Sequence, residues 1–242
     1  MTPEELVDAT AAQINALGAV YYFHPDTIAY GKEELGLDGM RFYFLGRGGV
    51  LGDVSASVAT AAFGYFAPKV MDKMWKSSRA KVAPRRAVKA ALHSNAEIGR
   101  KALGDMPELA AFCDAAEQVV ADADPAGLRI YGGLAVQPLP EDLPGRAMQL
   151  LVVHRELRGD VHLAAVHAAG IHPKIAHAIR RPNDLAAFGW PEDVSVTDND
   201  RARLDAVDVE TDAMSAQHYS SLSDEQRDAF VAGVNAIAEV LL

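Results

Sequence analysis

The stretch HRELRGDVHLAAVHAAGIHPKIAH, from His154 to His177, decides the fold, because it combines helical apolar spacing with many titratable side chains. Five of the eight histidines lie in it, together with Arg155, Arg158 and Asp160. A helix lined with Leu, Val and Ala is expected to bury most of its surface. Burying a titratable group costs free energy unless the group has a partner. The stretch therefore predicts a long buried helix whose polar residues are either matched structural pairs or a functional site.

Residues four apart share one face of a helix, so His154, Arg158 and His162 form a ridge if the helix continues through Gly159. An arginine beside both histidines disfavours further positive charge, and we expect these histidines to be neutral near pH 7. Asp160 lies off this ridge. It orients a histidine only if the helix bends or if the histidine comes from another element.

The remaining histidines are spaced poorly for a metal. His162, His167, His172 and His177 recur every five residues, which rotates successive side chains by about 140° around a helix. Metal ligands must converge from compatible directions, so we expect no metal site. No GxSxG motif indicates a serine nucleophile. The sequence specifies no cofactor.

The composition places the chain among ordered, mostly helical proteins. Half of the 242 residues are hydrophobic, and strand-like alternation is scarce, which predicts an all-α fold. The net charge of −10 repels nucleic acids and anionic membranes. The longest uncharged run, Val54–Pro68, is shorter than the ~20 residues that cross a bilayer, so we expect no membrane association. The single Cys113 and the absence of a signal pattern predict a cytoplasmic protein.

One segment departs from this acidic balance. Residues 69–89 contain eight basic side chains and only one acid, Asp72. The segment is either a solvated helix face or a patch that faces an anion or a nucleic acid.

Breaker residues indicate the organisation of the chain. We expect an N-terminal helical domain at residues 1–122, a linker or crossover at 123–144, and a C-terminal helix-turn-helix-like domain at 145–242. Gly170 ends one helix and Pro173 begins the next, which gives residues 162–181 helix-turn-helix spacing. The predicted helices cover residues 3–17, 55–67, 70–77, 84–103, 107–121, 146–170, 174–181, 199–215 and 223–242.

Three local patterns leave alternatives open. Residues 21–23 and 41–45 are aromatic and fit either short strands or helix ends. Four glycines around Arg47 predict a turn in which the backbone approaches another group closely. In the last helix, Phe230, Val234, Ile237 and Leu241 form a face that either packs internally or forms a homodimer seam.

An ordered set of short motifs resembles the SalK-type helix-turn-helix-like family of actinobacterial proteins. The residues that carry the resemblance are Phe23, Pro25, Asp26, Gly36, Leu37, Gly39, Tyr43, Phe44, Arg47, Leu51, Gly52, Arg158, Gly159, Asp160, His162, Ala164, Ala165, Thr211 and Asp212. The resemblance implies winged-helix-like modules with at most short β-hairpins, and no specific biochemical activity. The chain departs from the family in the short segment between Trp190 and Thr211, where relatives carry a wing-like stretch.

These patterns support three classes of function. The first is a protein with a pocket for an anionic small molecule or a cofactor. Such a protein would be either a binding protein or an enzyme of specialised metabolism. Its ligand-binding residues would be Tyr43, Arg47, Arg158 and Asp212, because arginines bind anions in a bidentate manner. His162 would be the catalytic acid or base, and Asp160 or Asp212 would orient it.

The second class is a winged-helix transcriptional regulator that binds DNA. The acidic net charge argues against DNA binding. The second predicted helix of residues 162–181 also has few cations, namely Lys174, Arg180 and Arg181. The sequence leaves this question open. The third class is a structural or assembly protein without ligand or DNA. A polar cluster near the end of the chain, with Asp205, Asp208, Glu210 and Asp212, is also expected to neutralise arginines of the first half.

Overall fold

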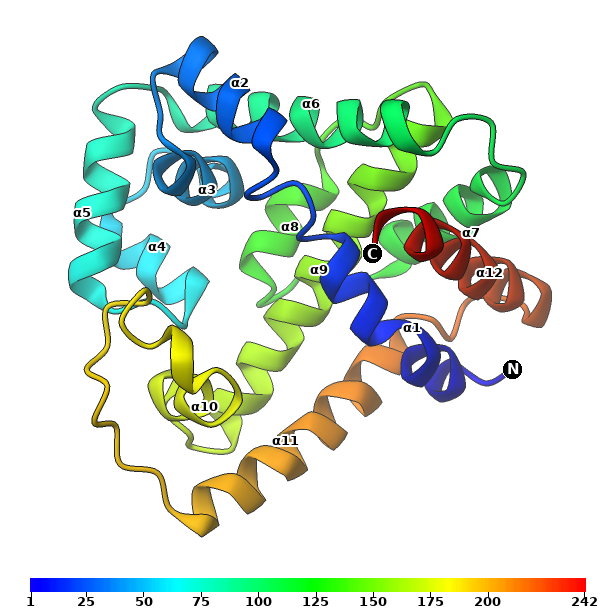
Figure 1. Cartoon of the computed structure of the whole chain (residues 1–242). Helices are drawn as coiled ribbons and strands as arrows, with labels where there is room; N and C mark the ends of the chain where they lie inside the picture. The colour runs from blue at the N-terminus through cyan, green and yellow to red at the C-terminus, as the bar shows by residue number, and fades with distance from the viewer.

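The computed structural model describes residues 1–242 as twelve α-helices with no β-strand (Figure 1). The predicted all-α class is confirmed, and the absence of strands means that no helix pair carries a β-wing. No helix is both long enough and apolar enough to cross a membrane. The helices are α1 (Pro3–Leu17), α2 (Pro25–Leu35), α3 (Gly39–Gly48), α4 (Ala56–Phe63), α5 (Pro68–Arg79), α6 (Pro84–Ala102), α7 (Leu109–Asp122), α8 (Arg129–Ala135), α9 (Leu143–Ala168), α10 (Pro173–Arg180), α11 (Asp198–Gln217) and α12 (Asp224–Leu241), with 3₁₀ turns at Gly49–Leu51 and Pro182–Asp184.

Capping residues explain where the helices begin. Capping boxes at Thr2, Thr197 and Ser223 start α1, α11 and α12, where each side chain satisfies a free backbone N–H group. Asp142 caps α9 by accepting a hydrogen bond from the N–H group of Gly145 at 2.9 Å. Proline occupies the first turn of α2, α5, α6, α9 and α10, where its missing N–H group costs nothing.

The central element is α9, which crosses the molecule diagonally in Figure 1 and packs against α1, α6, α7, α8, α10 and α11. It continues without a break through Gly159, so the predicted ridge of His154, Arg158 and His162 exists. The two ends of the ridge meet different surroundings. His154 is buried beneath α7 and the C-terminal helices, whereas His162 is half-buried near α11.

The glycine-rich segment around Arg47 is helical rather than a turn, so that prediction is wrong. Residues 41–45 and the following glycines form α3, which ends at Gly48. The predicted close approach of the backbone is confirmed: a Cβ atom on Gly46 would lie 2.8 Å from a methyl group of α6, and one on Gly48 would lie 2.6 Å from Phe63. Arg47 therefore projects from a rigid helix that is pressed against its neighbours.

The segment 123–144, which the sequence indicates as a linker, contains α8 and contributes to the core. Ile130 and Tyr131 of α8 are fully buried. A single hydrophobic cluster of 49 buried residues includes side chains from both sides of this segment. Packing joins the two parts in one core, so the division of the chain into two domains stays a prediction.

The last helix packs inward. Phe230, Val234 and Ile237 are buried, and α12 lies against α7 and α1. The same chain covers this face, so it is not available as a homodimer seam.

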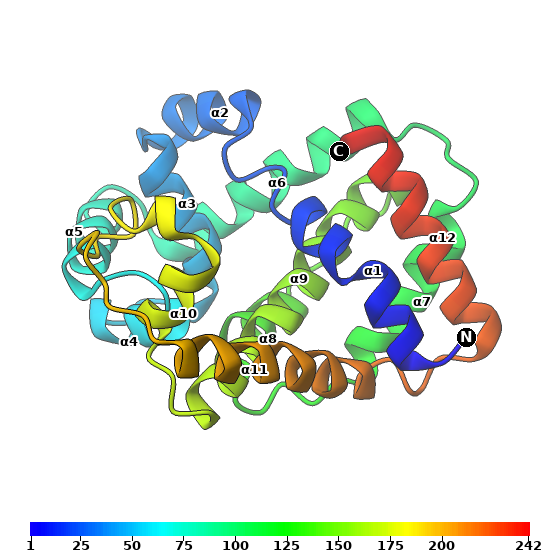
Figure 2. The same ribbon diagram turned by 60° about the horizontal axis from the view of Figure 1, so that its bottom comes forward.

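A separate cover is formed by α10 and the loop after it, which lie beside α3, α4 and α5 in Figure 2. A second cluster of only six buried residues joins α10 to the end of α9 and to α11. The loop is fastened to the link between α4 and α5: Phe188 stacks on Phe66 at 4.1 Å, and the Trp190 indole N–H donates to the Tyr65 carbonyl oxygen at 2.7 Å. The cover closes one side of the space between α3, α4 and α9.

Candidate functional site

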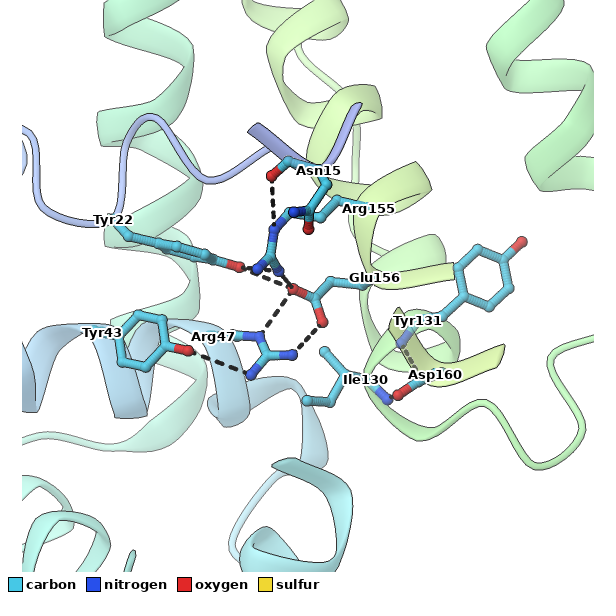
Figure 3. A network of polar contacts seen from close by, with 9 residues as sticks. All are labelled: Asn15, Tyr22, Tyr43, Arg47, Ile130, Tyr131, Arg155, Glu156 and Asp160. Atoms are coloured by element: carbon cyan, nitrogen blue, oxygen red, sulfur yellow. Dashed lines mark hydrogen bonds and ion pairs between the residues drawn. The ribbon is translucent and has the colours of Figure 1, made fainter. Parts of the chain in front are cut away.

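A fully buried carboxylate, Glu156 of α9, accepts hydrogen bonds from three side chains (Figure 3). Arg47 of α3 reaches it with two nitrogen atoms, Nε at 2.8 Å from Oε1 and Nη2 at 2.6 Å from Oε2. The Tyr22 hydroxyl donates to Oε1 at 2.8 Å, and Arg155 Nη1 donates to the same oxygen at 2.5 Å. A bidentate arginine with further hydrogen bonds is the geometry that a buried carboxylate needs. We call these four residues the Glu156 network.

The Glu156 network carries more positive than negative charge. Burial by itself would raise the pKa of Glu156, but the guanidinium groups of Arg47 and Arg155 outweigh burial and lower this pKa to about 2. Burial opposes the charge on Arg47, yet Glu156 raises the pKa of this arginine well above its ordinary value. Two guanidinium groups face one carboxylate, so the network leaves an excess positive charge beside the adjoining cavity.

That cavity has a volume of about 570 Å³ and lies between α1, α3, α4, α9, α10, α11 and the loop with Phe188. Its walls carry five arginines but only three aspartates, in a chain whose net charge is −10. The aromatic rings of Tyr43, Phe63, Tyr65, Phe66 and Phe188 supply the apolar part of the wall. An arginine-rich cavity with flat apolar walls is suited to an anion that carries a ring.

All six candidate residues from the sequence lie on the wall of this cavity. They are Tyr43, Arg47, Arg158, Asp160, His162 and Asp212. They come from α3, α9 and α11, which are far apart in the sequence. The structure therefore brings these side chains around one space, while their roles in binding or catalysis stay predictions.

The partner of His162 differs from the expected aspartate. Its Nδ1 atom lies 3.0 Å from the hydroxyl of Thr211, and Asp208 is further away at 3.9 Å. Asp212 pairs instead with Arg158, whose Nη2 atom donates to it at 2.7 Å. Burial is the main reason that the pKa of His162 is lowered, with a smaller contribution from Arg158. The expected neutral state is thus supported, chiefly by desolvation.

Asp160 is oriented by backbone groups and does not contact His162. Its Oδ2 atom accepts hydrogen bonds from the N–H groups of Ile130 and Tyr131, at 2.8 and 2.9 Å, where α8 begins (Figure 3). Burial raises the pKa of Asp160 to about 6, although the N–H group of Tyr131 opposes this rise. The helix does not bend at Gly159, so the predicted pairing of Asp160 with a ridge histidine is absent.

The acidic residues of α11 neutralise arginines of the second half of the chain, and not of the first half as the sequence indicates. Arg180 of α10 bonds to Asp205 and Asp208, and Arg158 of α9 bonds to Asp212. These ion pairs fasten α11 along the open side of the cavity.

Three buried polar atoms on the cavity wall have no hydrogen-bond partner in the chain. They are Nε of Arg158, Nε2 of His177 and the hydroxyl of Tyr65. The His177 residue is only 5% exposed. Burial lowers the pKa of His177 and raises that of Tyr65, so both side chains are neutral near pH 7. Buried polar groups normally have partners, and unpaired ones beside a cavity indicate a place for a bound molecule.

His154 has a structural role, by contrast. Its Nδ1 atom lies 3.0 Å from the Tyr219 hydroxyl and its Nε2 atom 3.2 Å from the Ala116 carbonyl oxygen. Burial lowers the pKa of His154 to about 4. Both ring nitrogens are satisfied within the core, so this histidine joins α9 to α7 and to the turn before α12.

Sequence reasoning missed Glu156, Tyr22 and Tyr65. A signal for Glu156 was present, because it is the only acid among the arginines of HRELR and buried arginines require a counter-charge. No comparable signal marks Tyr22 or Tyr65, which lie in irregular segments and meet α9 only through the tertiary fold.

Comparison with known proteins gives one informative match. A family model described as a helix-turn-helix family matches residues 7–184, which is most of the chain. The chain belongs to this helix-turn-helix family. No curated protein and no solved structure matches the chain significantly.

Within the region matched by the helix-turn-helix family, several helix pairs have a connection of only three or four residues, and two of them bear on DNA binding. The sequence indicated the pair α9–α10, whose turn is Ala169–His172. The pair α5–α6 is joined by the four residues Ala80–Ala83 and has the same organisation. Of these two pairs, only α9–α10 contributes residues to the cavity wall.

Proposed function

We propose that the chain binds a small anionic molecule with a planar ring in the arginine-rich cavity. The observation that carries the proposal is the set of three buried polar atoms on its wall, on Arg158, His177 and Tyr65, for which the chain supplies no partner. Leaving such groups unpaired costs about 1–3 kcal/mol each, which a ligand with matching donors and acceptors recovers.

The arrangement of these groups favours an acid joined to a ring. Arg158 Nε is an obligate donor, and Arg181 on the same wall has no ion pair, so both suit a carboxylate or a similar anion. Phe66 and Phe188, stacked at 4.1 Å, provide a flat apolar surface for the ring. Acid–base chemistry on such a ligand would fall to His162, whose pKa is lowered by burial, and to Asp160, whose pKa is raised by burial to about 6.

Isothermal titration calorimetry with three naphthalene probes tests the proposal. The probes share one ring system and differ in charge: 1-naphthoate, 1-naphthalenemethanol and 1-naphthylmethylamine. We expect naphthoate to bind most tightly, and His177→Phe to weaken it by about tenfold, since one hydrogen bond is lost. His93→Phe makes the same exchange on the exposed side of α6 and should leave the affinity unchanged. Equal binding of all three probes, or no binding, would refute the proposal.

A second candidate function is DNA binding, which the family match and the exposed cations of α5 and α6 favour. Cations that contact phosphates release counterions, so such binding weakens steeply with salt. Fluorescence anisotropy with a labelled 20-base-pair duplex tests it directly. We expect binding at about 50 mM salt and a loss of about tenfold or more at about 200 mM. If adding the protein at about 50 mM salt leaves the anisotropy of the duplex unchanged, DNA binding is excluded.

A further inference from the structure

The strongest concentration of uncompensated charge on the surface lies on α5 and the beginning of α6. We define the basic face by six exposed side chains, Lys69, Lys73, Lys76, Arg85, Arg86 and Lys89. We propose that duplex DNA docks on the basic face through its phosphate backbone. This inference rests on the second proposed function and assigns it to α5–α6 instead of α9–α10.

Helical spacing aligns these cations. Lys69, Lys73 and Lys76 follow one another at four and three residues, so they share one face of α5. Arg85 and Lys89 are four residues apart and share one face of α6. Among the six, only Lys76 forms an ion pair, with Asp72 at 2.7 Å. The others have no acidic partner, which is the condition for contacting phosphates.

The arrangement of the two helices matches that of a DNA-reading pair. In Figure 1, α5 runs down one side of the molecule while α6 runs across its top, and the turn at Ala80–Ala83 joins them at the corner. No side chain caps the first turn of α6, where Ala83 is the N-cap residue. The N-terminal end of the second helix is the part that enters a DNA groove in helix-turn-helix proteins, and the side chain of Arg85 is exposed at this end of α6.

A wide hollow at this corner strengthens the assignment. Its lining includes Lys76, Arg79 and Arg85, and its volume is about 740 Å³. One acid, Asp53, also lies in the hollow, where it forms an ion pair with Arg79. The hollow remains positively charged and open to solvent, so a phosphate chain can reach it.

The alternative pair lacks these properties. In α10, Arg180 is held by Asp205 and Asp208 of α11, and Lys174 lies over the ring of Trp190 at 6.0 Å. The acidic helix α11 runs alongside α10 and repels phosphate. In Figure 1, α6 lies at the top of the molecule and α11 at the bottom, so the acidic helix α11 is far from α6.

Besides Asp72 on α5 and Asp53 in the hollow, α2 borders the basic face and carries acids. Arg86 donates to the carbonyl oxygen of Glu34 at 3.2 Å, and Lys81, at the turn before α6, donates to that of Gly36 at 2.8 Å. Glu33 and Glu34 are themselves exposed at this edge. We therefore expect DNA to lie along α5 and the first turn of α6, away from α2.

Two charge-reversed double variants of the full chain test the assignment. K73E/K89E changes two exposed residues of the basic face, and K174E/R181E makes the same change in net charge on α10. Anisotropy with the 20-base-pair duplex at about 50 mM salt is the readout, and thermal melting verifies folding. We expect K73E/K89E to weaken binding by about tenfold or more and to reduce the salt slope by about two, whereas K174E/R181E changes affinity by less than about threefold.

Each failure has a distinct meaning. If K174E/R181E loses binding and K73E/K89E retains it, the basic face is wrong while DNA binding stands. If the unaltered chain does not bind the duplex at low salt, both the surface and the function fail. If duplex or single-stranded RNA of the same sequence binds far more tightly than the DNA duplex, DNA is the wrong partner for this face.

Discussion

Polar side chains in the core beside α9 and polar side chains around the cavity that α9 borders differ in whether their atoms have hydrogen-bond partners. Glu156 and His154 are buried, and every polar atom of these two side chains has a partner in the chain. Two residues beyond Glu156, Arg158 lines the cavity and has a buried Nε atom without a partner, and His177 and Tyr65 on other parts of the cavity wall also carry unpartnered polar atoms. Glu156 and His154 are thus fully paired, whereas three residues around the cavity that α9 borders are not.

The difference separates two reasons for which a protein keeps buried polar residues. A satisfied network stabilises one arrangement of the helices and is damaged when any member is removed. An unsatisfied buried group lowers stability, by about 1–3 kcal/mol, and is retained only if something else binds it. Mutations on the two sides of α9 should therefore separate stability from binding.

The largest effect on stability is expected at Glu156. Replacing it with Gln leaves the guanidinium groups of Arg47 and Arg155 buried beside a neutral amide, so the free energy of unfolding should fall by about 3–5 kcal/mol. Urea denaturation followed by circular dichroism measures this change. A loss below about 1 kcal/mol would show that the Glu156 network is not what joins α3 to α9.

His154 should make the chain sensitive to acid. Burial holds the pKa of folded His154 at about 4, below its ordinary value of 6.5, so only the unfolded chain binds a proton between these values. The stability that depends on this histidine is therefore complete above about pH 6.5 and is lost as the pH falls toward 4, by about 1.4 kcal/mol per pH unit.

Comparison with His154→Gln isolates this contribution, since the other buried histidines remain. The free energy of unfolding of the unaltered chain should fall more steeply than that of His154→Gln between pH 6.5 and 4. Parallel curves for the two proteins would mean that the ring of His154 is accessible to protons in the folded state.

The cavity side should respond in the opposite direction. His177→Phe removes an unpartnered nitrogen and preserves the contact between this ring and Phe188, whose ring centroids are 4.0 Å apart, so the free energy of unfolding should rise by about 1 kcal/mol. The same variant should lose naphthoate affinity. A large loss of stability with intact binding would reverse the assignment of the two sides of α9.

The smallest effect is expected at an exposed ion pair. Asp72→Asn breaks the contact with Lys76 on α5, and such pairs contribute about 0.5 kcal/mol or less. Chemical denaturation of this variant sets the baseline against which the change at Glu156 is judged. A change comparable to that of Glu156→Gln would remove the distinction between buried and surface charges.

Much of this fold follows from local sequence signals. Breaker residues such as Gly170 and Pro173, together with helical apolar spacing, gave most helix bounds within a few residues. The helices α2, α3 and α8 were missed, because glycine around Arg47 and between residues 123 and 144 resembles turn sequence while it serves close packing. Glycine in a turn and glycine at a helix crossing differ only in tertiary context.

The candidate site was predictable in position and only partly in its bonding. Buried charge in an apolar helix correctly indicated where Arg158 and His162 would gather with Arg47. The partners, however, come from side chains with no sequence relation to α9, such as Thr211 for His162. Spacing along one helix defines which side chains share a face. Their hydrogen-bond partners, however, depend on how helices that are distant in the sequence pack together.

A crystal structure of the chain soaked with 1-naphthoate tests most directly whether the polar atoms of the cavity wall are there for a ligand. The carboxylate should lie within hydrogen-bond distance of Arg158 Nε, with the ring against Phe66 and with His177 Nε2 or the Tyr65 hydroxyl also paired. Naphthoate bound elsewhere, with the cavity filled only by water that satisfies these atoms, would contradict it.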